Sequence, residues 1–208
     1  MNSLVIDLIK LTGADGFAIN GVEAGDNCGG AVDGLGDVNG DEIDDFIIGA
    51  RSANGGIGES YVVFGSKQVW PSSINLADLD GSDGFSIHGR AIRGDSGTSV
   101  SAAGYINGDD IADILIGAPS VGGNVGQSYI VFGSKDPWPR AMNISNLNGN
   151  NGFTITGINA DDNSGYAVSC AGDVNGDVNG DGIDDIIIGA PDANSENGQS
   201  YIIFGEGK

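Results

Sequence analysis

The side chains with the clearest chemical potential lie in short, glycine-rich runs of aspartate and asparagine. The first run places oxygen-bearing side chains at its first, third, fifth and ninth positions, which are Asp37, Asn39, Asp41 and Asp45. Alternate residues of a tight loop point toward one centre, and the seventh residue, Ile43, can add its backbone carbonyl. Calcium prefers six to eight oxygen ligands of this kind. The run therefore predicts a calcium site.

The second run keeps only part of this pattern. It supplies Asn107, Asp109, Ile111 and Asp113 at the matching offsets, but Tyr105 stands where the first carboxylate belongs. Loss of a carboxylate removes both charge and a ligand. We expect this loop to bind calcium more weakly or not at all, although a water molecule can take the coordination position of the missing carboxylate.

The third run repeats the full pattern and is preceded by a second Asp-Val-Asn-Gly segment. Either Asp173 or Asp177 can therefore be its first ligand, and the offset to the last aspartate favours Asp177. The ligands predicted for this loop are Asp177, Asn179, Asp181, Ile183 and Asp185.

Two other interpretations of the runs are less favoured. An EF-hand needs a bidentate glutamate at position 12 and flanking helices, but position 12 is Ile48 in the first run and Ile188 in the third, each within an apolar strand-like segment. An ordinary Asx-rich turn does not account for two loops with four oxygen side chains at identical offsets.

The elements that position these loops recur along the whole chain. Phe17, Phe85 and Phe153 begin similar phrases at a spacing of 68 residues, and the third copy carries four additional residues within its acidic region. Each copy contains short β-branched and aromatic runs bounded by glycine, which are typical of strands. No segment has helical periodicity over more than one or two turns, and the closest is residues 74–79. Many short, evenly spaced strands predict β-propeller blades.

We therefore predict an all-β fold in which each blade has four antiparallel strands. The chain is interpreted as a single module, residues 1–208, made of three repeats at about 1–68, 69–136 and 137–208.

These phrases resemble the FG-GAP repeat, which builds the propeller of integrin alpha subunits and related bacterial proteins. The resemblance lies in the Gly-Asp-Val-Asn-Gly-Asp run, the following Asp-Asp and apolar strand, the Gly-Ala-Pro at residues 117–119 and 189–191, and the Tyr-Val-Val-Phe-Gly strand. The first copy departs from it, with Arg51 in place of proline. The resemblance implies a structural calcium ion between the first and second strands of each blade, and ligand binding through other loops.

Three repeats are too few for a familiar ring, since propellers have four to eight blades. The resemblance also implies that residues 17–19 form the outer strand of a preceding blade, so that the third blade lacks its own. The N-terminal strand can fill this position within the chain or from a neighbour. We predict a homodimer that closes a six-bladed ring; the alternative is a fragment of a longer propeller.

The amino-acid composition limits the classes of molecule that the protein is expected to bind. The 208 residues include 29 acidic and 8 basic ones, for a formal charge of −21, which disfavours nucleic acid. The two cysteines and one histidine give no zinc or disulfide framework. No apolar run is long enough to span a membrane, and no signal peptide is recognisable. We expect an extracellular or cell-surface location.

The predicted function is calcium-stabilised protein binding or adhesion, with an unknown protein or carbohydrate ligand. The alternative is lectin-like carbohydrate binding through Trp70 and Trp138, although such residues more often pack a loop onto its neighbours. We expect no enzymatic activity, because His88 is the only histidine and is replaced by Asn20 and Thr156 in its sister strands.

Overall fold

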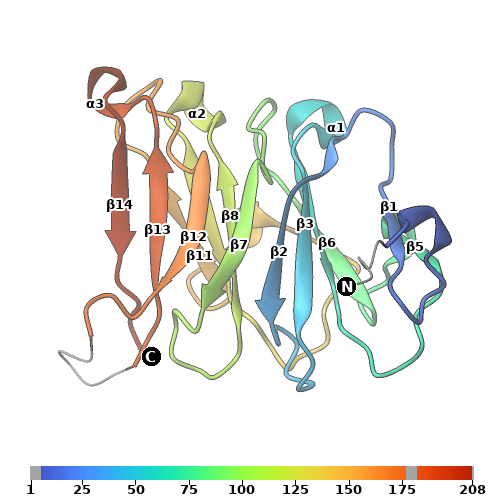
Figure 1. Cartoon of the computed structure of the whole chain (residues 1–208). Coiled ribbons are helices and arrows are strands. Elements are labelled where there is room, and N and C mark those ends of the chain that lie inside the picture. The colour runs from blue at the N-terminus through green and yellow to red at the C-terminus, as the bar shows by residue number, and fades with distance from the viewer. Residues whose placement is uncertain (1–5, 177–181, 208) are drawn as a thin grey trace, which may run out of the picture.

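The fold is all-β, as predicted. A computed structural model describes residues 6–176 and 182–207. Its strands form three upright sheets that stand side by side, with a small two-stranded sheet at one end (Figure 1). No helix in the described ranges is long and apolar enough to cross a membrane.

The first sheet has the strand order β10-β6-β4-β3-β2. Its four main strands pair antiparallel, whereas β10 joins β6 in parallel. The predicted sharing of strands between repeats is thereby confirmed, because β6 comes from the second sequence period and completes the sheet of the first. The strands are β2 (Cys28–Gly36), β3 (Asp45–Ala50), β4 (Glu59–Val63), β6 (Gly84–His88) and β10 (Ala141–Asn143).

The second sheet repeats this plan with the order β11-β9-β8-β7. In the third sheet the described residues form three strands in the order β12-β13-β14, so β14 has no outer neighbour there. The strands are β7 (Ser99–Gly104), β8 (Asp113–Ala118), β9 (Gln127–Val131), β11 (Gly152–Thr156), β12 (Ala167–Gly172), β13 (Asp185–Ala190) and β14 (Gln199–Ile203).

Neighbouring sheets pack against one another face to face, and their inner strands are in contact. Strand β7 contacts β2 on one side and β12 on the other. The residues of the middle strands are almost entirely buried, including Ile47 in β3, Ile116 in β8 and Ile188 in β13. Apolar area removed from water in this way stabilises the stack by about 25 cal/mol per Å².

Among residues 6–176 and 182–207, helical structure is confined to single turns. The turn expected near residues 74–79 is the 3₁₀ helix η2 (Leu76–Asp78), which is repeated as η3 (Ile144–Asn146), with η1 (Leu8–Lys10) near the N-terminus. Three further turns follow the middle strand of each sheet and lie at the same end of the molecule (Figure 1). These are α1 (Ala53–Gly56), α2 (Val121–Asn124) and α3 (Ala193–Glu196).

The N-terminal strand β1 (Ala18–Asn20) does not complete the third sheet within the chain. It pairs in parallel with β5 (Ser73–Asn75) at the opposite end of the molecule from β14 (Figure 1). The register of β1 on β5 repeats that of β6 on β10 one period later, since Ala18 faces Ser73 as Ser86 faces Ala141. Strand β1 therefore occupies the outer-strand position of a sheet that would precede the first.

Candidate functional site

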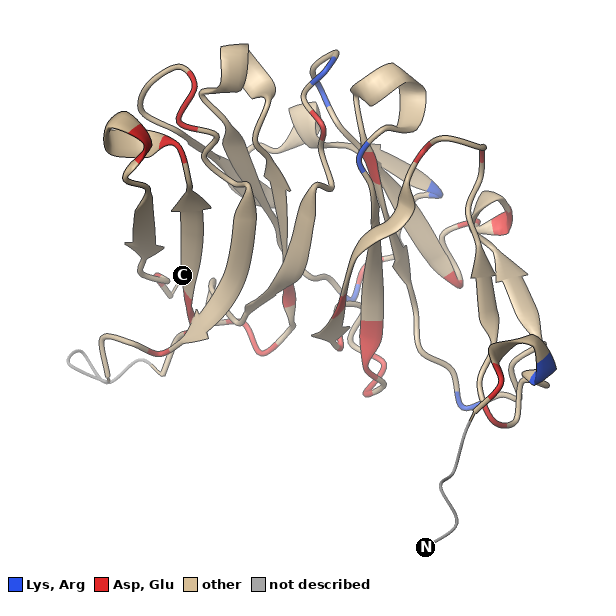
Figure 2. Ribbon diagram, turned by 45° about the horizontal axis from the view of Figure 1, so that its top comes forward, with Lys and Arg blue, Asp and Glu red and all other residues tan. Residues whose placement is uncertain are grey.

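The first acidic loop joins β2 to β3, and its carboxylates gather at the end of the sheet opposite α1 (Figure 2). Asp37 Oδ1 accepts hydrogen bonds from the amides of Gly40 and Asp41 at 2.7 and 3.1 Å, and its Oδ2 accepts from Glu42 at 2.6 Å. Gly40 adopts a positive φ of 78°, which lets the chain curl around this carboxylate. The loop is thus already wound around its first predicted ligand.

The remaining predicted ligands of this loop follow the same winding. Asn39 Oδ1 accepts from the amide of Asp41 at 2.9 Å, and Asp41 Oδ1 accepts from the amide of Ile43 at 2.9 Å. The Asn39 side-chain amide also donates to Asp41 Oδ2 at 3.3 Å. Successive alternate positions are therefore linked by hydrogen bonds within the loop.

Asp45 ties the loop to two strands. Its carboxylate is 2% exposed and accepts from the amides of Val38 at 2.9 Å and Gly65 at 2.8 Å. Burial raises the pKa of Asp45 to about 6, opposed by these two hydrogen bonds and reinforced by the nearby charges of Asp41 and Asp37. A cation bound in the loop would offset this accumulation of negative charge.

The second loop retains the buried aspartate at its ninth position, which we call the anchor, and lacks the carboxylate at its first position. Asp113 is fully buried and accepts from the amide of Gly133 at 2.9 Å, as Asp45 does from Gly65. The Gly108 amide donates to the backbone carbonyl of Tyr105 at 2.9 Å, because no carboxylate is present there. Tyr105 is 46% exposed, and its side chain carries no carboxylate for the loop.

The inner positions of the second loop nevertheless retain the same arrangement. Asn107 Oδ1 accepts from the amide of Asp109 at 3.0 Å, and Asp109 Oδ1 accepts from the amide of Ile111 at 3.1 Å. The loop is therefore a close copy of the first, without one carboxylate.

Only the flanks of the third loop are described. Asp177, Asn179 and Asp181 lie outside the described residues, so their prediction stays open. Asp185 is fully buried and accepts from the amide of Gly205 at 3.1 Å, which repeats the anchor of the other loops.

The duplicated lead-in occupies the position that Asp37 has in the first loop. Asp173 Oδ1 accepts from the amide of Gly176 at 2.7 Å, and Val174 donates to Asp185 Oδ2 at 2.9 Å, as Val38 does to Asp45. The described geometry gives Asp173 a backbone partner equivalent to that of Asp37, whereas Asp177, which sequence offsets favoured as the first ligand, lies outside the described residues. The signal was available in the sequence, since Asp173 lies two periods of 68 residues after Asp37.

One buried atom in the third loop bears on whether a cation fits. Asn175 Oδ1 is buried and accepts no hydrogen bond within the described residues. A buried carbonyl oxygen without a donor costs about 1–3 kcal/mol, and a cation would satisfy it. Asn175 corresponds to Asn39, one of the predicted ligands of the first loop.

The carboxylates do not yet converge as they would around an ion. Over residues 6–176 and 182–207, no three Asp, Glu, His or Cys side chains are grouped closely enough to hold a metal. The reason is visible in the first loop, where Asp37 and Asp41 turn toward the backbone amides of the loop itself. Calcium binding would require these oxygens to rotate inward, with asparagine and backbone carbonyl oxygens completing the set.

The two tryptophans pack on the outer strands. The ring of Trp70 stacks on Phe17 at a centroid distance of 4.4 Å, and that of Trp138 stacks on Phe85 at 4.2 Å. Trp138 also donates its indole N–H to the carbonyl of Ser134 at 3.2 Å. One face of each ring is therefore covered, in agreement with a packing role.

A second polar cluster lies on the outer part of the first sheet. Cross-strand pairing places Glu59 of β4 opposite His88 of β6. The sequence alone does not identify the partners of His88, because Glu59 lies on a neighbouring strand 29 positions earlier in the chain. The Nδ1 atom of His88 lies 2.7 Å from a Glu59 oxygen and its Nε2 lies 3.2 Å from the Ser86 hydroxyl.

Comparison with known proteins supports the repeat. Residues 164–203, from the third sheet, match the FG-GAP repeat model. The third period is therefore an FG-GAP repeat, and the first two periods share its sequence phrases and strand pairing. The resemblance to FG-GAP repeat proteins is confirmed.

The chain is also similar to two curated proteins. It is 30% identical over 175 residues to phosphatidylinositol-glycan-specific phospholipase D of Bos taurus and 29% identical over 175 residues to that of Homo sapiens. The match covers 80% of this chain but 19% of each relative. Because the chain spans about a fifth of these relatives, the activity in their name stays with those proteins.

Proposed function

We propose that this chain is a β-propeller module stabilised by calcium in its acidic loops and used for binding a protein partner outside the cell. The observation that carries the proposal is the winding of the first loop, where Asp37, Asn39 and Asp41 are gathered by backbone hydrogen bonds above the buried Asp45. The match to the FG-GAP repeat supports the same class of module.

Calcium would act on the structure rather than on a substrate. Clustered carboxylates repel one another, and the net charge of −21 adds to this cost throughout the molecule. An ion bound between β2 and β3 would neutralise the cluster and fix the loop. We expect affinities of about 10⁻⁴ to 10⁻³ M, as in other extracellular modules.

Calorimetric titration of the chain with calcium chloride tests this proposal directly. We expect saturable binding that Asp37→Ala and Asp41→Ala each weaken, while Asp33→Ala, outside the loop, leaves it unchanged. Absence of saturable heat in the millimolar range would contradict the calcium assignment.

We further propose that two chains join head to tail into a six-bladed ring. The third sheet supports this, because its outer edge is open among the described residues. Ile202 in β14 is 42% exposed, whereas Val62 and Ile130 at the same position of the other sheets are 0% exposed. Strand β1 of a second chain would cover it in the register of β6 on β4, with Phe17 opposite Ile202.

Light scattering in the presence of calcium tests the ring. We expect the mass of a dimer, dissociated by Ile202→Glu and retained by Ile158→Glu, which alters an exposed residue just after β11 of the second sheet. A monomer at all concentrations would contradict the proposal.

Carbohydrate binding is the second candidate function. A cavity of about 670 Å³ lies beside Trp138, with Asn150, Asn151, Asp109 and Lys135 on its wall. An aromatic ring with amide and carboxylate groups is suited to the hydroxyls and apolar faces of a sugar. Binding to a glycan array that Trp138→Ala abolishes and Trp70→Ala preserves would support this candidate.

A further inference from the structure

Three side chains on the first sheet form a continuous hydrogen-bonded line. Ser86 and His88 are two residues apart on β6, so their side chains emerge on the same face of the strand. The Ser86 hydroxyl lies 3.2 Å from His88 Nε2, and His88 Nδ1 lies 2.7 Å from Glu59 Oε1. A hydroxyl, an imidazole and a carboxylate thus stand in the order that nucleophilic catalysis uses.

The carboxylate fixes the orientation of the imidazole. Glu59 is 7% exposed, and it also accepts hydrogen bonds from the Tyr61 hydroxyl and the Asn54 side-chain amide. An ionised carboxylate can only accept, so the contact places a proton on His88 Nδ1. In the neutral ring Nε2 is then an acceptor, directed at the Ser86 hydroxyl. This is the tautomer that a general base requires.

The second sheet shows that the fold does not need this set. Its equivalent residues are Gln127, Thr154 and Thr156, in which no group can act as a base. Gln127 there accepts from the Tyr129 hydroxyl at 2.7 Å and donates to Thr156 at 3.2 Å. A neutral amide can therefore accept the hydrogen bond of the buried tyrosine, and the ionisable set in the first sheet is additional to this requirement.

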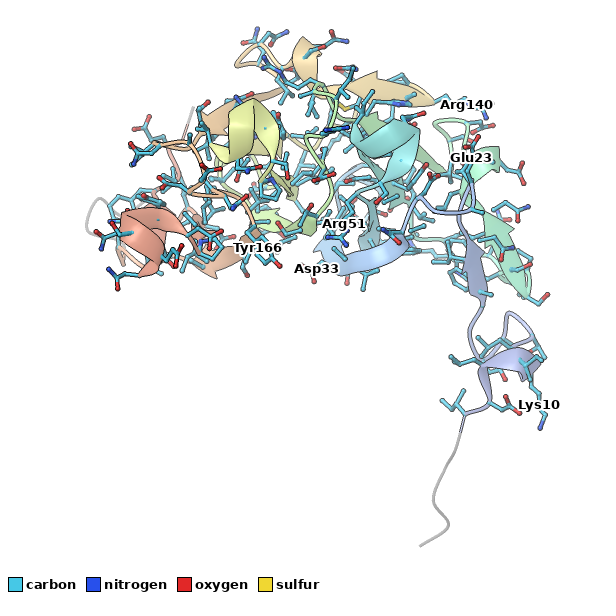
Figure 3. All side chains as sticks on the ribbon, turned by 90° about the horizontal axis from the view of Figure 1, so that it is seen from above. Lys10, Glu23, Asp33, Arg51, Arg140 and Tyr166 are labelled. Carbon is cyan, nitrogen blue, oxygen red and sulfur yellow. The ribbon has the colours of Figure 1, made fainter. Side chains whose placement is uncertain are left out.

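A cavity gives a substrate access to the hydroxyl. It has a volume of about 240 Å³ and is lined by Ser86 and His88 together with the apolar side chains of Leu76 and Leu79. Arg140 forms part of the same wall and lies on the outer side of the molecule, away from Asp33 of the inner strand (Figure 3). The size suits a short acyl group.

Arg140 brings a positive charge to this cavity. One of its guanidinium N–H groups donates to the carbonyl of Ala77 at 2.7 Å, which holds the side chain against the wall. The guanidinium carries five N–H donors in total, so it can also stabilise an oxyanion that develops in the cavity.

We propose that Ser86, His88 and Glu59 form an acyl-transfer site that hydrolyses small carboxylic esters. The Ser86 oxygen bonds to the ester carbonyl carbon while its proton passes to His88 Nε2. The bond to the leaving alcohol then breaks, and the alcohol takes that proton. Water attacks the acyl-serine, gives a proton to His88 and releases the acid as Ser86 regains its proton. Glu59 orients the ring throughout and stabilises its charged form.

The proposal is tested with p-nitrophenyl acetate as substrate and a fluorophosphonate probe as a covalent label, on the whole chain in calcium. We expect peptide mapping to find the label on Ser86. Ser86→Ala should abolish both labelling and turnover, and His88→Thr should reduce turnover about 100-fold or more. Glu59→Gln should lower kcat far more than it raises KM, because Glu59 acts on turnover by orienting the base.

The variants are taken from the chain's own sister strands, which protects the fold. Alanine stands at the position of Ser86 in β1 as Ala18, and threonine and glutamine stand at the other two positions in the second sheet. Thr154→Ala is the matched control and should leave turnover unchanged. Equal turnover by the Ser86→Ala variant, or labelling distributed over other serines, would overturn the proposal.

Discussion

The first two acidic loops are near-copies that differ at one ligand position, and the difference separates two roles of aspartate. Asp45 and Asp113 are both buried and both hold the amide at the end of the third strand of their sheet, so this role is kept in each loop. Asp37 binds three loop amides, whereas the carbonyl of Tyr105 accepts one amide in its place. The buried aspartate ties the loop to the sheet in both cases, whereas the carboxylate at the first position, which we propose to bind a cation, is present only in the first loop.

Removal of calcium is expected to have the largest effect. With dissociation constants of about 10⁻⁴ to 10⁻³ M and about 10 mM calcium, two complete loops would contribute about 4 kcal/mol through mass action. For a chain of this size, that corresponds to a fall in melting temperature of about 10 °C in excess EDTA. Calorimetric melts with and without EDTA measure the effect, and identical melts would count against calcium in either loop.

Substitution of an anchor is expected to cost almost as much, and equally in both loops. Asp45→Ala and Asp113→Ala each leave buried backbone amides without an acceptor, at a cost of about 3 kcal/mol in the free energy of unfolding. Urea denaturation in EDTA isolates this effect from calcium. Asp44→Ala, at an exposed neighbouring position, is the control and should change little. A cost in one loop but not in the other would break the comparison.

Restoration of the missing carboxylate should stabilise the second loop. Tyr105→Asp is expected to add about 1 kcal/mol in millimolar calcium and nothing in EDTA, because the gain comes from binding. The readout is the difference between the two melting temperatures. A gain of equal size in both conditions would show that removal of an exposed aromatic ring, rather than calcium, is responsible.

An effect of the same small size is expected for the contrast between two equivalent ligands, Asp41 and Asp109. Asp41→Ala should lower stability in calcium by about 1 kcal/mol more than Asp109→Ala, because only the first loop has a complete set to lose. Parallel urea titrations of both variants measure the contrast. The difference should vanish in EDTA, and a larger loss for Asp109→Ala would reverse our ranking of the loops.

Much of this architecture was readable from the sequence because the second and third strands of each sheet are short β-branched and aromatic runs next to glycine. The repeated phrases that begin at Phe17 and Phe85 gave the period, and the sharing of β6 with the first sheet followed from the family resemblance. The parallel strands β5 and β10 were not predicted. They are three residues long, and their pairing depends on contacts between segments that are more than 50 residues apart.

The candidate sites were predictable to different degrees. The acidic loops are local, so their ligands could be read from offsets alone. The line from Ser86 to Glu59 crosses two strands, and no local pattern relates residues 59 and 88. The choice between Asp173 and Asp177 depended on which copy of a duplicated segment occupies the loop, and offsets counted from Asp185 and from Asp37 give different answers.

The strand β6 has a consequence for how such a protein can grow or shrink. Because the outer strand of the first sheet is encoded at the start of the second period, a deletion that removes one sequence period also removes part of its neighbour's sheet. A deletion from Arg90 to Gly157 would instead remove the four strands of the second sheet together with β10, the short parallel strand at the edge of the first sheet. The sequence period is therefore out of phase with the sheet, and gain or loss of a whole repeat keeps the antiparallel strands of every sheet together only when both boundaries fall just after an outer strand.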